Sequence, residues 1–305
     1  MPMRRVAEDV FQIPLAPRNA INAYLLGDVV VDAGTKGAAK RLIKALHGHV
    51  VAAHALTHGH PDHAGGSKRL TDAFEAPVWV GERDRADVEA GRPTAAETWA
   101  KPAVARLTRY EPVAVGRVLR EGDDLGHGFT VLETPGHSDG HLAFWRESDR
   151  TLVAGDVFFN LHMLTTVPGL REPPAILTRD PRRNRESARR LAALEPELAL
   201  FGHGPPLRDP AALTAFAEAL EALARSTNAW RTSSVPTRPR CPASSPSCAA
   251  GWPSAASGSC RSPIRPPSRG RGRSWPAASA SGRCSSACPP DRCSAHWTAR
   301  SRSPT

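Results

Sequence analysis

Residues 57–66 have the sequence Thr-His-Gly-His-Pro-Asp-His-Ala-Gly-Gly and stand between an apolar run, 50–56, and a predicted helix, 66–74. Six consecutive residues of this segment hold four potential metal ligands: His58, His60, Asp62 and His63. Neutral imidazole and carboxylate are ligands that Zn²⁺ accepts at about 2.0–2.2 Å. Within such a loop, two alternate side chains can point to one metal ion, and the next two donors can point to a second metal ion. The spacing therefore predicts a two-metal site instead of a solvated polar loop.

Further candidate ligands occur where predicted strands end, each beside a glycine: His137, Asp156 and His203. Glycine allows a close approach of backbone and metal because it has no side chain. A single loop histidine is usually a surface or capping residue, so the prediction rests on the joint order of the segments. His141 is expected to line the cavity or to support a ligand from behind. The other histidines are expected to have ordinary roles: His47, His49, His54, His127, His162 and His296.

Strand and helix patterns alternate along the first 230 residues. Two short apolar runs within 21–32 flank Gly27-Asp28, which is a strong hairpin signal. Further strands are predicted at 50–56, 77–80, 117–119, 129–133, 142–145, 151–154 and 198–201. Helices are predicted at 38–46, 66–74, 181–194 and 209–225. Because short turns join several of the strands, a mixed sheet system covered by helices is favoured over a purely parallel sheet.

Composition divides the chain near residue 230. All six cysteines lie beyond residue 240, and 231–305 contain 12 arginines, 18 serines, 12 prolines, no lysine and one acidic residue, Asp291. The formal net charge of +10 for the whole chain is therefore +11 for 231–305 and −1 for 1–230. Without apolar periodicity, the tail cannot bury enough surface to offset the entropy lost on folding. We predict a folded domain, 1–230, and a disordered low-complexity tail, 231–305.

Other interpretations of the tail stay open. Its cysteines are not spaced as the close pairs of zinc modules, and the Arg-Gly steps at 269–273 have few aromatic neighbours on which RNA bases could stack. An out-of-frame translation of a GC-rich gene would explain together the loss of periodicity, the missing lysine and the excess of Arg, Ser, Pro and Cys.

Targeting signals are not found. The first ten residues lack the apolar run of about 7–15 residues that a signal peptide needs, and no later run approaches the roughly 18 apolar residues of a membrane span. The sequence predicts a soluble, cytoplasmic protein that acts on a small molecule and has no membrane partner. The charge of −1 argues against nucleic-acid binding by residues 1–230, and the basic tail would bind nucleic acid only weakly and non-specifically.

The four ligand segments, in this order, resemble the metallo-β-lactamase superfamily, especially its glyoxalase II-like hydrolases. The resemblance covers about residues 8–225 and implies an α+β fold, a four-layer αβ/βα sandwich with metal ions at one edge between the sheets. It implies a first zinc ion held by His58, His60 and His137, and a second held by Asp62, His63 and His203. Asp156 would bridge the two ions. Asp32 resembles the family's early acidic residue, which supports the ligands from behind.

The implied activity is that of a zinc-dependent hydrolase, with iron or manganese as other possible metals. A metal-bridging hydroxide would cleave a thioester, ester or lactone-type bond. Asp62 would bind metal and also orient the hydroxide or carry its proton. Common zinc β-lactamases have cysteine where Asp156 stands, which disfavours a lactam substrate. The oxygen-reducing diiron branch has glutamate in place of His60 and a fused flavodoxin domain, and neither is present.

Three alternatives stay open: a persulfide-dioxygenase-like enzyme with a single iron, an RNA phosphodiesterase of the tRNA 3′-processing type, and a member that binds without turnover. Family members often carry a helical or winged-helix C-terminal segment that completes the substrate site, and 231–305 do not resemble one. The segment 157–180 is expected either to form a wall of the pocket or to be a plain surface connection.

Overall fold

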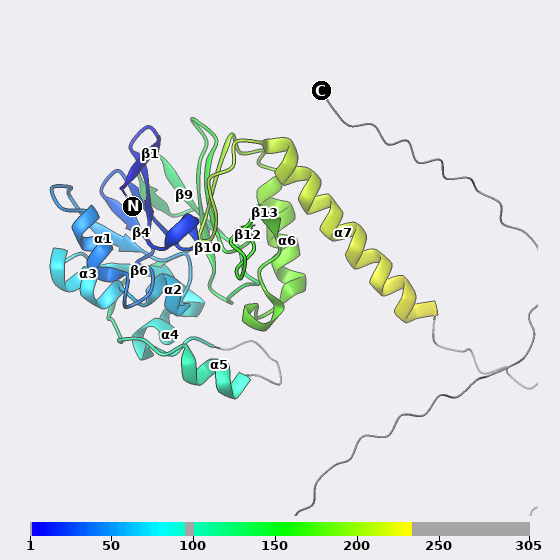
Figure 1. Cartoon of the computed structure of the whole chain (residues 1–305), viewed down its shortest axis with the longest axis horizontal. Helices are drawn as coiled ribbons and strands as arrows, with labels where there is room; N and C mark the ends of the chain where they lie inside the picture. The colour runs from blue at the N-terminus through cyan, green and yellow to red at the C-terminus, as the bar shows by residue number, and fades with distance from the viewer. Residues whose placement is uncertain (1, 95–100, 234–305) are drawn as a thin grey trace, which may run out of the picture. The chain divides into compact units, whose positions relative to one another are not determined.

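A computed structural model of the chain describes residues 2–94 and 101–233 (Figure 1). The predictions for the tail, its cysteines and His296 fall outside the described residues and stay predictions. The expected boundary after residue 230 falls inside the last helix, α7 (Pro210–Ser233), which continues past it to Ser233. Within the described residues, no helix is both long enough and apolar enough to cross a bilayer.

The first sheet has seven strands in the order of the chain. Its members are β1 (Arg4–Ala7), β2 (Val10–Pro14), β3 (Asn22–Leu26), β4 (Val29–Val31), β5 (Ala53–Ala55), β6 (Val78–Gly81) and β7 (Val115–Leu119). Pairing is antiparallel from β1 to β4 and parallel from β4 to β7. The predicted hairpin is confirmed as β3 and β4. Gly27 forms its turn with a φ of 60°, which glycine adopts without strain.

The second sheet has five strands in the order β14-β11-β10-β9-β8. Its members are β8 (Asp124–Gly126), β9 (Phe129–Glu133), β10 (Leu142–Arg146), β11 (Thr151–Gly155) and β14 (Leu198–Phe201). The pair β11 and β14 is parallel, and the other pairs are antiparallel. The prediction of mixed sheets is therefore confirmed. A separate two-stranded ribbon, β12 (Phe159–Leu161) and β13 (Pro168–Arg171), occupies part of the segment 157–180.

Helices cover the outer faces of the two sheets (Figure 1). The α-helices before α7 are α1 (Ala39–Ala45), α2 (Pro61–Ala64), α3 (Ser67–Phe74), α4 (Arg85–Ala90), α5 (Lys101–Leu107) and α6 (Pro181–Ala192). Short 3₁₀ turns are η1 (Pro17–Asn19), η2 (Glu82–Asp84) and η3 (Ala175–Leu177). Leu42 of α1 and Leu70 of α3 pack on one face of the first sheet. Leu191 of α6 and Leu213 of α7 pack on the second sheet.

A third apolar core fills the space between the two sheets. Tyr24 and Leu26 of the first sheet meet Phe129, Phe144 and Leu200 of the second, all at most 1% exposed. Full burial of a side chain of this size stabilises the fold by about 1.5–3 kcal/mol. Apolar cores lie between the two sheets and between each sheet and its helices. The layers of the sandwich therefore follow the order helices, sheet, sheet, helices. The predicted α+β fold, a four-layer αβ/βα sandwich, is confirmed.

Several predicted elements differ in extent from the structure. The strand expected at 50–56 is only Ala53–Ala55, because Val50 is 73% exposed and belongs to the approach to the strand. The loop expected at 57–63 contains a single helical turn, α2. The strands β1, β2 and β8 and the helices α4 and α5 carry no clear periodic signal, and the sequence did not predict them.

Candidate metal centre

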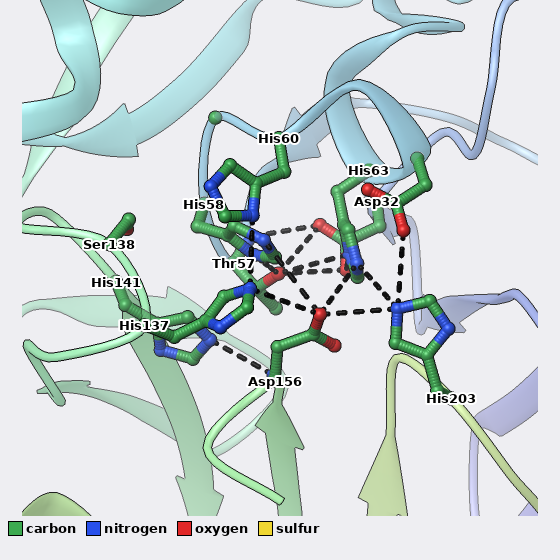
Figure 2. A network of polar contacts seen from close by, with 12 residues as sticks. Asp32, Thr57, His58, His60, His63, His137, Ser138, His141, Asp156 and His203 are labelled. Atoms are coloured by element: carbon green, nitrogen blue, oxygen red, sulfur yellow. Dashed lines mark hydrogen bonds and ion pairs between the residues drawn. The ribbon is translucent and has the colours of Figure 1, made fainter. Parts of the chain in front are cut away.

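The candidate ligands gather at one edge of the sandwich because they follow strands that run in the same direction. His58 and His60 come after β5, His137 after β9, Asp156 after β11 and His203 after β14. The carboxyl ends of parallel strands meet at the same edge, where open α/β sheets commonly bind their ligands. Figure 2 shows these side chains, from both sheets, pointing toward one another.

The turn after β5 directs its ligands through a short helix. His60 stands just before α2 in an extended conformation, and Pro61 is the first helical residue. Proline suits this position because its fixed φ matches the helix and no backbone N–H is needed there. The helical turn then places Asp62 and His63 beside the residues that precede it. The local sequence thus brings four candidate ligands to one place.

The donor atoms form three overlapping groups, and within each group all atoms lie within 4.8 Å of one another. The first group is His58, His60 and His137, and the third is Asp62, His63 and His203. They match the two ligand sets that the sequence predicted. The middle group takes His58 from the first set and His63 from the second, and adds Asp156. All seven predicted ligands are therefore brought together, and their metal-binding roles stay a prediction.

Asp156 lies between the two sets. Its Oδ2 atom is 3.4 Å from Nε2 of His137 in the first set. The same oxygen is 3.3 Å from Nε2 of His63 and 3.2 Å from Nε2 of His203 in the second set. Burial would raise the pKa of the Asp156 carboxyl, but His203 and His63 hold it well below its usual range. One ionised carboxylate thus faces both sets.

Two histidines of the first set, His58 and His137, are neutral and oriented by threonines. Thr57 donates its hydroxyl hydrogen to Asp32, so Nδ1 of His58 donates to the Thr57 oxygen at 3.1 Å. In the same way, Thr178 donates to a carbonyl and accepts from Nδ1 of His137 at 3.3 Å. Burial holds the pKa of both histidines well below its usual value. Each imidazole therefore presents an unprotonated Nε2, the form that binds metal.

The histidines of the second set are held by acceptors. Nδ1 of His63 donates to Asp32 at 2.8 Å, and Nδ1 of His203 donates to the carbonyl of Ala20 at 2.6 Å. Burial lowers the pKa of His203, but Asp156 and Asp62 outweigh it and raise the pKa to about 10. Asp156 and Asp32 likewise raise the pKa of His63 well above its usual value against burial. A metal ion would replace a proton at each Nε2 atom.

Asp32 supports the site from behind, as the resemblance implied. Besides His63, its carboxylate accepts the backbone N–H of Thr57 at 2.9 Å. Asp32 is 1% exposed and has a φ of 62°, a left-handed conformation that aspartate adopts more readily than most residues. The strand β4 and the first part of the ligand loop are thereby fixed to each other.

His141 supports the site from the other sheet. Its Nε2 accepts the backbone N–H of Asp156 at 3.0 Å, so its Nδ1 donates to the hydroxyl of Thr134 at 2.8 Å. Burial lowers the pKa of His141 to about 4. The expectation of a supporting role is therefore met by this contact, whereas His141 is not among the residues that line the cavity at the ligands.

The donor set fits a metal ion. Nε2 of His58 and Oδ1 of Asp156 are buried and have no hydrogen-bond partner among the described residues. Such orphaned polar atoms are rare in proteins and call for a ligand. A mixture of imidazole and carboxylate donors suits Zn²⁺, and also Fe or Mn. The residues present thus fit the metals that the sequence implied.

A cavity of about 190 Å³ opens beside the ligands. Asp62, His60, His137 and Asp156 form its floor. Its other lining residues are Pro61, Pro93, Thr94, Val104, Thr108, Phe159 and Leu177. Phe159 and Leu177 belong to the segment 157–180. That segment therefore forms part of the pocket wall, which was one of the two roles expected for it.

Sequence reasoning missed three buried residues that hold the ligand loops: Asp84, Tyr110 and Thr178. Asp84 follows β6 and accepts the backbone N–H of Gly59 at 2.9 Å. Tyr110 donates its hydroxyl hydrogen to the carbonyl of Gly59 at 2.8 Å. Single residues of this kind, outside any spaced motif, give no signal in one sequence. His127, one of the histidines for which an ordinary role was expected, pairs with Asp28 at the surface.

Among known proteins, the chain is similar to the probable metallo-hydrolase YflN of Bacillus subtilis, with 29% identity over 59% of this chain and 76% of that protein. It is also similar to a hydroxyacylglutathione hydrolase of Bdellovibrio bacteriovorus, with 31% identity over 50% of this chain and 54% of that protein. Among solved structures, a motif mutant of a metallo-β-lactamase from Cronobacter sakazakii has a TM-score of 0.57, covering 77% of this chain and 99% of that one at 17% identity. That likeness concerns the fold alone.

The sequence model of the metallo-β-lactamase superfamily matches residues 16–203. The match starts before β3 and ends at the last candidate ligand, so it contains both ligand sets, and it extends over more than half of the chain. The resemblance seen in the sequence is confirmed: the chain belongs to the metallo-β-lactamase superfamily.

Proposed function

We propose that the chain is a zinc-dependent hydrolase that cleaves a thioester, ester or lactone-type bond. The position of Asp156 carries the proposal, because one carboxylate oxygen lies within 3.4 Å of nitrogens from both ligand sets. Two zinc ions, when bound, would supply an activated water and a Lewis acid for the carbonyl oxygen. The first would be held by His58, His60 and His137, the second by Asp62, His63 and His203, with Asp156 shared.

Asp62 is suited to handle the proton of the attacking water. Its side chain is 27% exposed and lines the cavity, while its Oδ2 lies 3.3 Å from Nε2 of His203. Burial would raise the pKa of Asp62, but His203 and His63 lower it below its usual range. The carboxylate is therefore ionised at neutral pH and can accept a hydrogen bond from a water molecule, which orients that water.

The cavity favours an uncharged acyl group. Apart from the candidate ligands, its described lining consists of apolar side chains and two threonines, without lysine or arginine. Polyanionic nucleic acid needs such cations to neutralise its phosphates. Thioesters, esters and lactones are therefore expected ahead of phosphodiesters. The similarity to a hydroxyacylglutathione hydrolase supports a thioester.

The test is metal analysis of the purified protein with a panel of thioesters, lactones, lactams and phosphodiesters. We expect close to two zinc ions per chain and fastest turnover of a thioester or lactone. A His58→Ala/His60→Ala variant should keep its fold, lose activity and hold less metal than the wild type. A single bound iron with oxygen uptake on a persulfide, or phosphodiester cleavage well ahead of thioester cleavage, would contradict the proposal.

A further inference from the structure

Asp84 lies outside both ligand sets and is 3% exposed. It ends the turn η2, just after β6, and its carboxylate accepts three hydrogen bonds. The donors are the backbone N–H of Gly59 at 2.9 Å, the hydroxyl of Ser138 at 2.7 Å and the backbone N–H of Gly140 at 2.7 Å. A buried carboxyl group whose oxygens accept three hydrogen bonds is a specific anchor, because its removal would leave buried donors without a partner.

These three donors belong to two different ligand loops. Gly59 separates His58 from His60, whereas Ser138 directly follows His137. The first loop comes from the first sheet and the second loop from the second sheet. Asp84 therefore joins, through one side chain, the two segments that carry the whole ligand set His58, His60 and His137.

The loop that follows His137 approaches Asp84 too closely to allow a side chain at Gly140. A Cβ atom at Gly140 would lie 2.5 Å from the backbone nitrogen of Asp84 and 2.7 Å from its Oδ1. Real Cβ atoms do not come within 3.0 Å of another residue's atoms. Gly59 is held on its other side as well, since its carbonyl accepts from Tyr110. The backbone between the two loops is thus fixed at several points.

The other ligand set is fixed by a different carboxylate. Asp32 accepts from His63 and from Thr57 and makes no hydrogen bond to the loop of His137. Asp32 thus supports His63 directly and, through Thr57, also His58, whereas Asp84 bonds to residues that stand beside His58, His60 and His137. Asp32 acts directly on a ligand, and Asp84 acts through the backbone on either side of its ligands.

We propose that Asp84 is the positioning residue of the set His58, His60 and His137, and that it sets the distance between the two loops which form that set. This inference rests on the proposed function in one respect: it assumes that the species bound by these residues is a metal ion. Loss of the Asp84 contacts is expected to weaken the first metal position selectively and to spare the second.

The experiment uses Asp84→Asn in the full chain. An amide keeps the shape of the side chain, but its NH₂ group cannot accept a hydrogen bond from Gly59 or Gly140. The two metal positions are separated by combining Asp84→Asn with a second substitution that removes a ligand of one set. In the His203→Ala background only the first set is intact, and in the His137→Ala background only the second set is intact. Zinc affinity is measured in each background by competition with a chelator, and the visible spectrum of the cobalt-loaded proteins reports the ligand geometry.

We expect Asp84→Asn to weaken zinc binding about 10- to 100-fold in the His203→Ala background and less than about twofold in the His137→Ala background. Asp32→Asn, which disturbs His63 directly and His58 through Thr57, should weaken zinc binding in both backgrounds. Asp72→Asn, which removes an exposed acid paired with Lys68 on α3, should change neither. If Asp84→Asn does not fold, Ser138→Ala removes one of the three contacts and should give a smaller effect of the same selectivity.

Equal weakening in both backgrounds, or no change in either, would overturn the role of Asp84. A wild-type protein that holds no metal would instead overturn the proposed function and the metal-positioning role with it. A wild-type protein with two ions and an unaffected Asp84→Asn variant would overturn the present inference alone. A changed cobalt spectrum of the first position, at unchanged thermal stability, would support positioning over a general structural role.

Discussion

Nε2 of His141 accepts the backbone N–H of Asp156 at 3.0 Å. A histidine that lies outside both ligand sets thus holds the backbone of the residue that lies between them. A Cβ atom on the neighbouring Gly155 would come within 2.7 Å of this nitrogen, and Gly155 has a φ of 54°. The turn after β11 is therefore built around the ring of His141.

Substitution His141→Ala is expected to lower the free energy of unfolding by about 1–3 kcal/mol, because the buried N–H of Asp156 loses its acceptor. Metal affinity should fall as well, since Asp156 is no longer held in place. Urea denaturation and chelator competition measure the two effects. His127→Ala, which removes a surface histidine, serves as control and should change stability by less than about 0.5 kcal/mol. Unchanged stability of His141→Ala would show that the contact is dispensable.

His54 makes stability depend on pH. It is fully buried between Val30 and Ser67, and burial lowers its pKa to about 4. Above pH 6.5 the ring is neutral in the folded and the unfolded chain. Between pH 6.5 and 4 only the unfolded chain takes up the proton, so folding loses up to about 3 kcal/mol as the pH falls.

The measurement is the difference in unfolding free energy between wild type and His54→Gln across pH 4–8. We expect this difference to shrink as the pH falls below 6.5, because the variant lacks the titrating ring. Comparing the two proteins cancels the titration of the metal-site histidines. A difference that is constant with pH would contradict the prediction.

Removal of metal should be coupled to proton uptake. The carboxylates of Asp156 and Asp62 keep the pKa of His203 at about 10, and the pKa of His63 is also raised well above its usual value. At pH 7.5 both rings should therefore take a proton when a metal ion leaves. Calorimetry of metal binding in buffers of different ionisation enthalpy counts these protons. We expect metal binding to release about two protons per chain in wild type and fewer in His203→Asn. Metal binding without proton release would argue against the second ligand set.

Asp62→Asn should lower kcat about 100- to 10,000-fold, the usual contribution of a general base. The amide cannot take a proton from water, although it can still contact His203. Turnover of a thioester is measured at saturating zinc, so that loss of metal and loss of proton transfer are separated. Asp72→Asn should leave kcat unchanged. Full recovery of kcat by excess zinc would restrict Asp62 to a ligand role.

A chain that ends at Ser233 is expected to fold and to bind metal. Every candidate ligand precedes residue 204, and the described fold ends with α7. Circular dichroism and metal analysis of the truncated protein test this expectation, and its substrate preference can be compared with that of the full chain. Loss of metal on truncation would mean that residues beyond Ser233 contribute to the site.

The sequence predicted which candidate ligands gather at the site better than it predicted the residues that hold them in place. The motif 57–66 has donors at short, fixed spacing, and the Gly27-Asp28 hairpin has a strong local signal, so both were found. Asp84 and Thr178 act through contacts between segments far apart in the chain, and nothing in their immediate neighbours marks them. The limits of β5 do not follow from apolar character either, because Leu56 is fully buried and still lies outside the strand.

The positions of the candidate ligands in the chain also determine the order in which they are synthesised. His58 and His60 follow a strand of the first sheet, whereas Asp156 and His203 follow strands of the second. Because a chain is synthesised from its N-terminus, and domains fold as units, the growing polypeptide holds an incomplete set of donors until His203 has left the ribosome. The full pair of candidate ligand sets is therefore present only after both sheets have been translated.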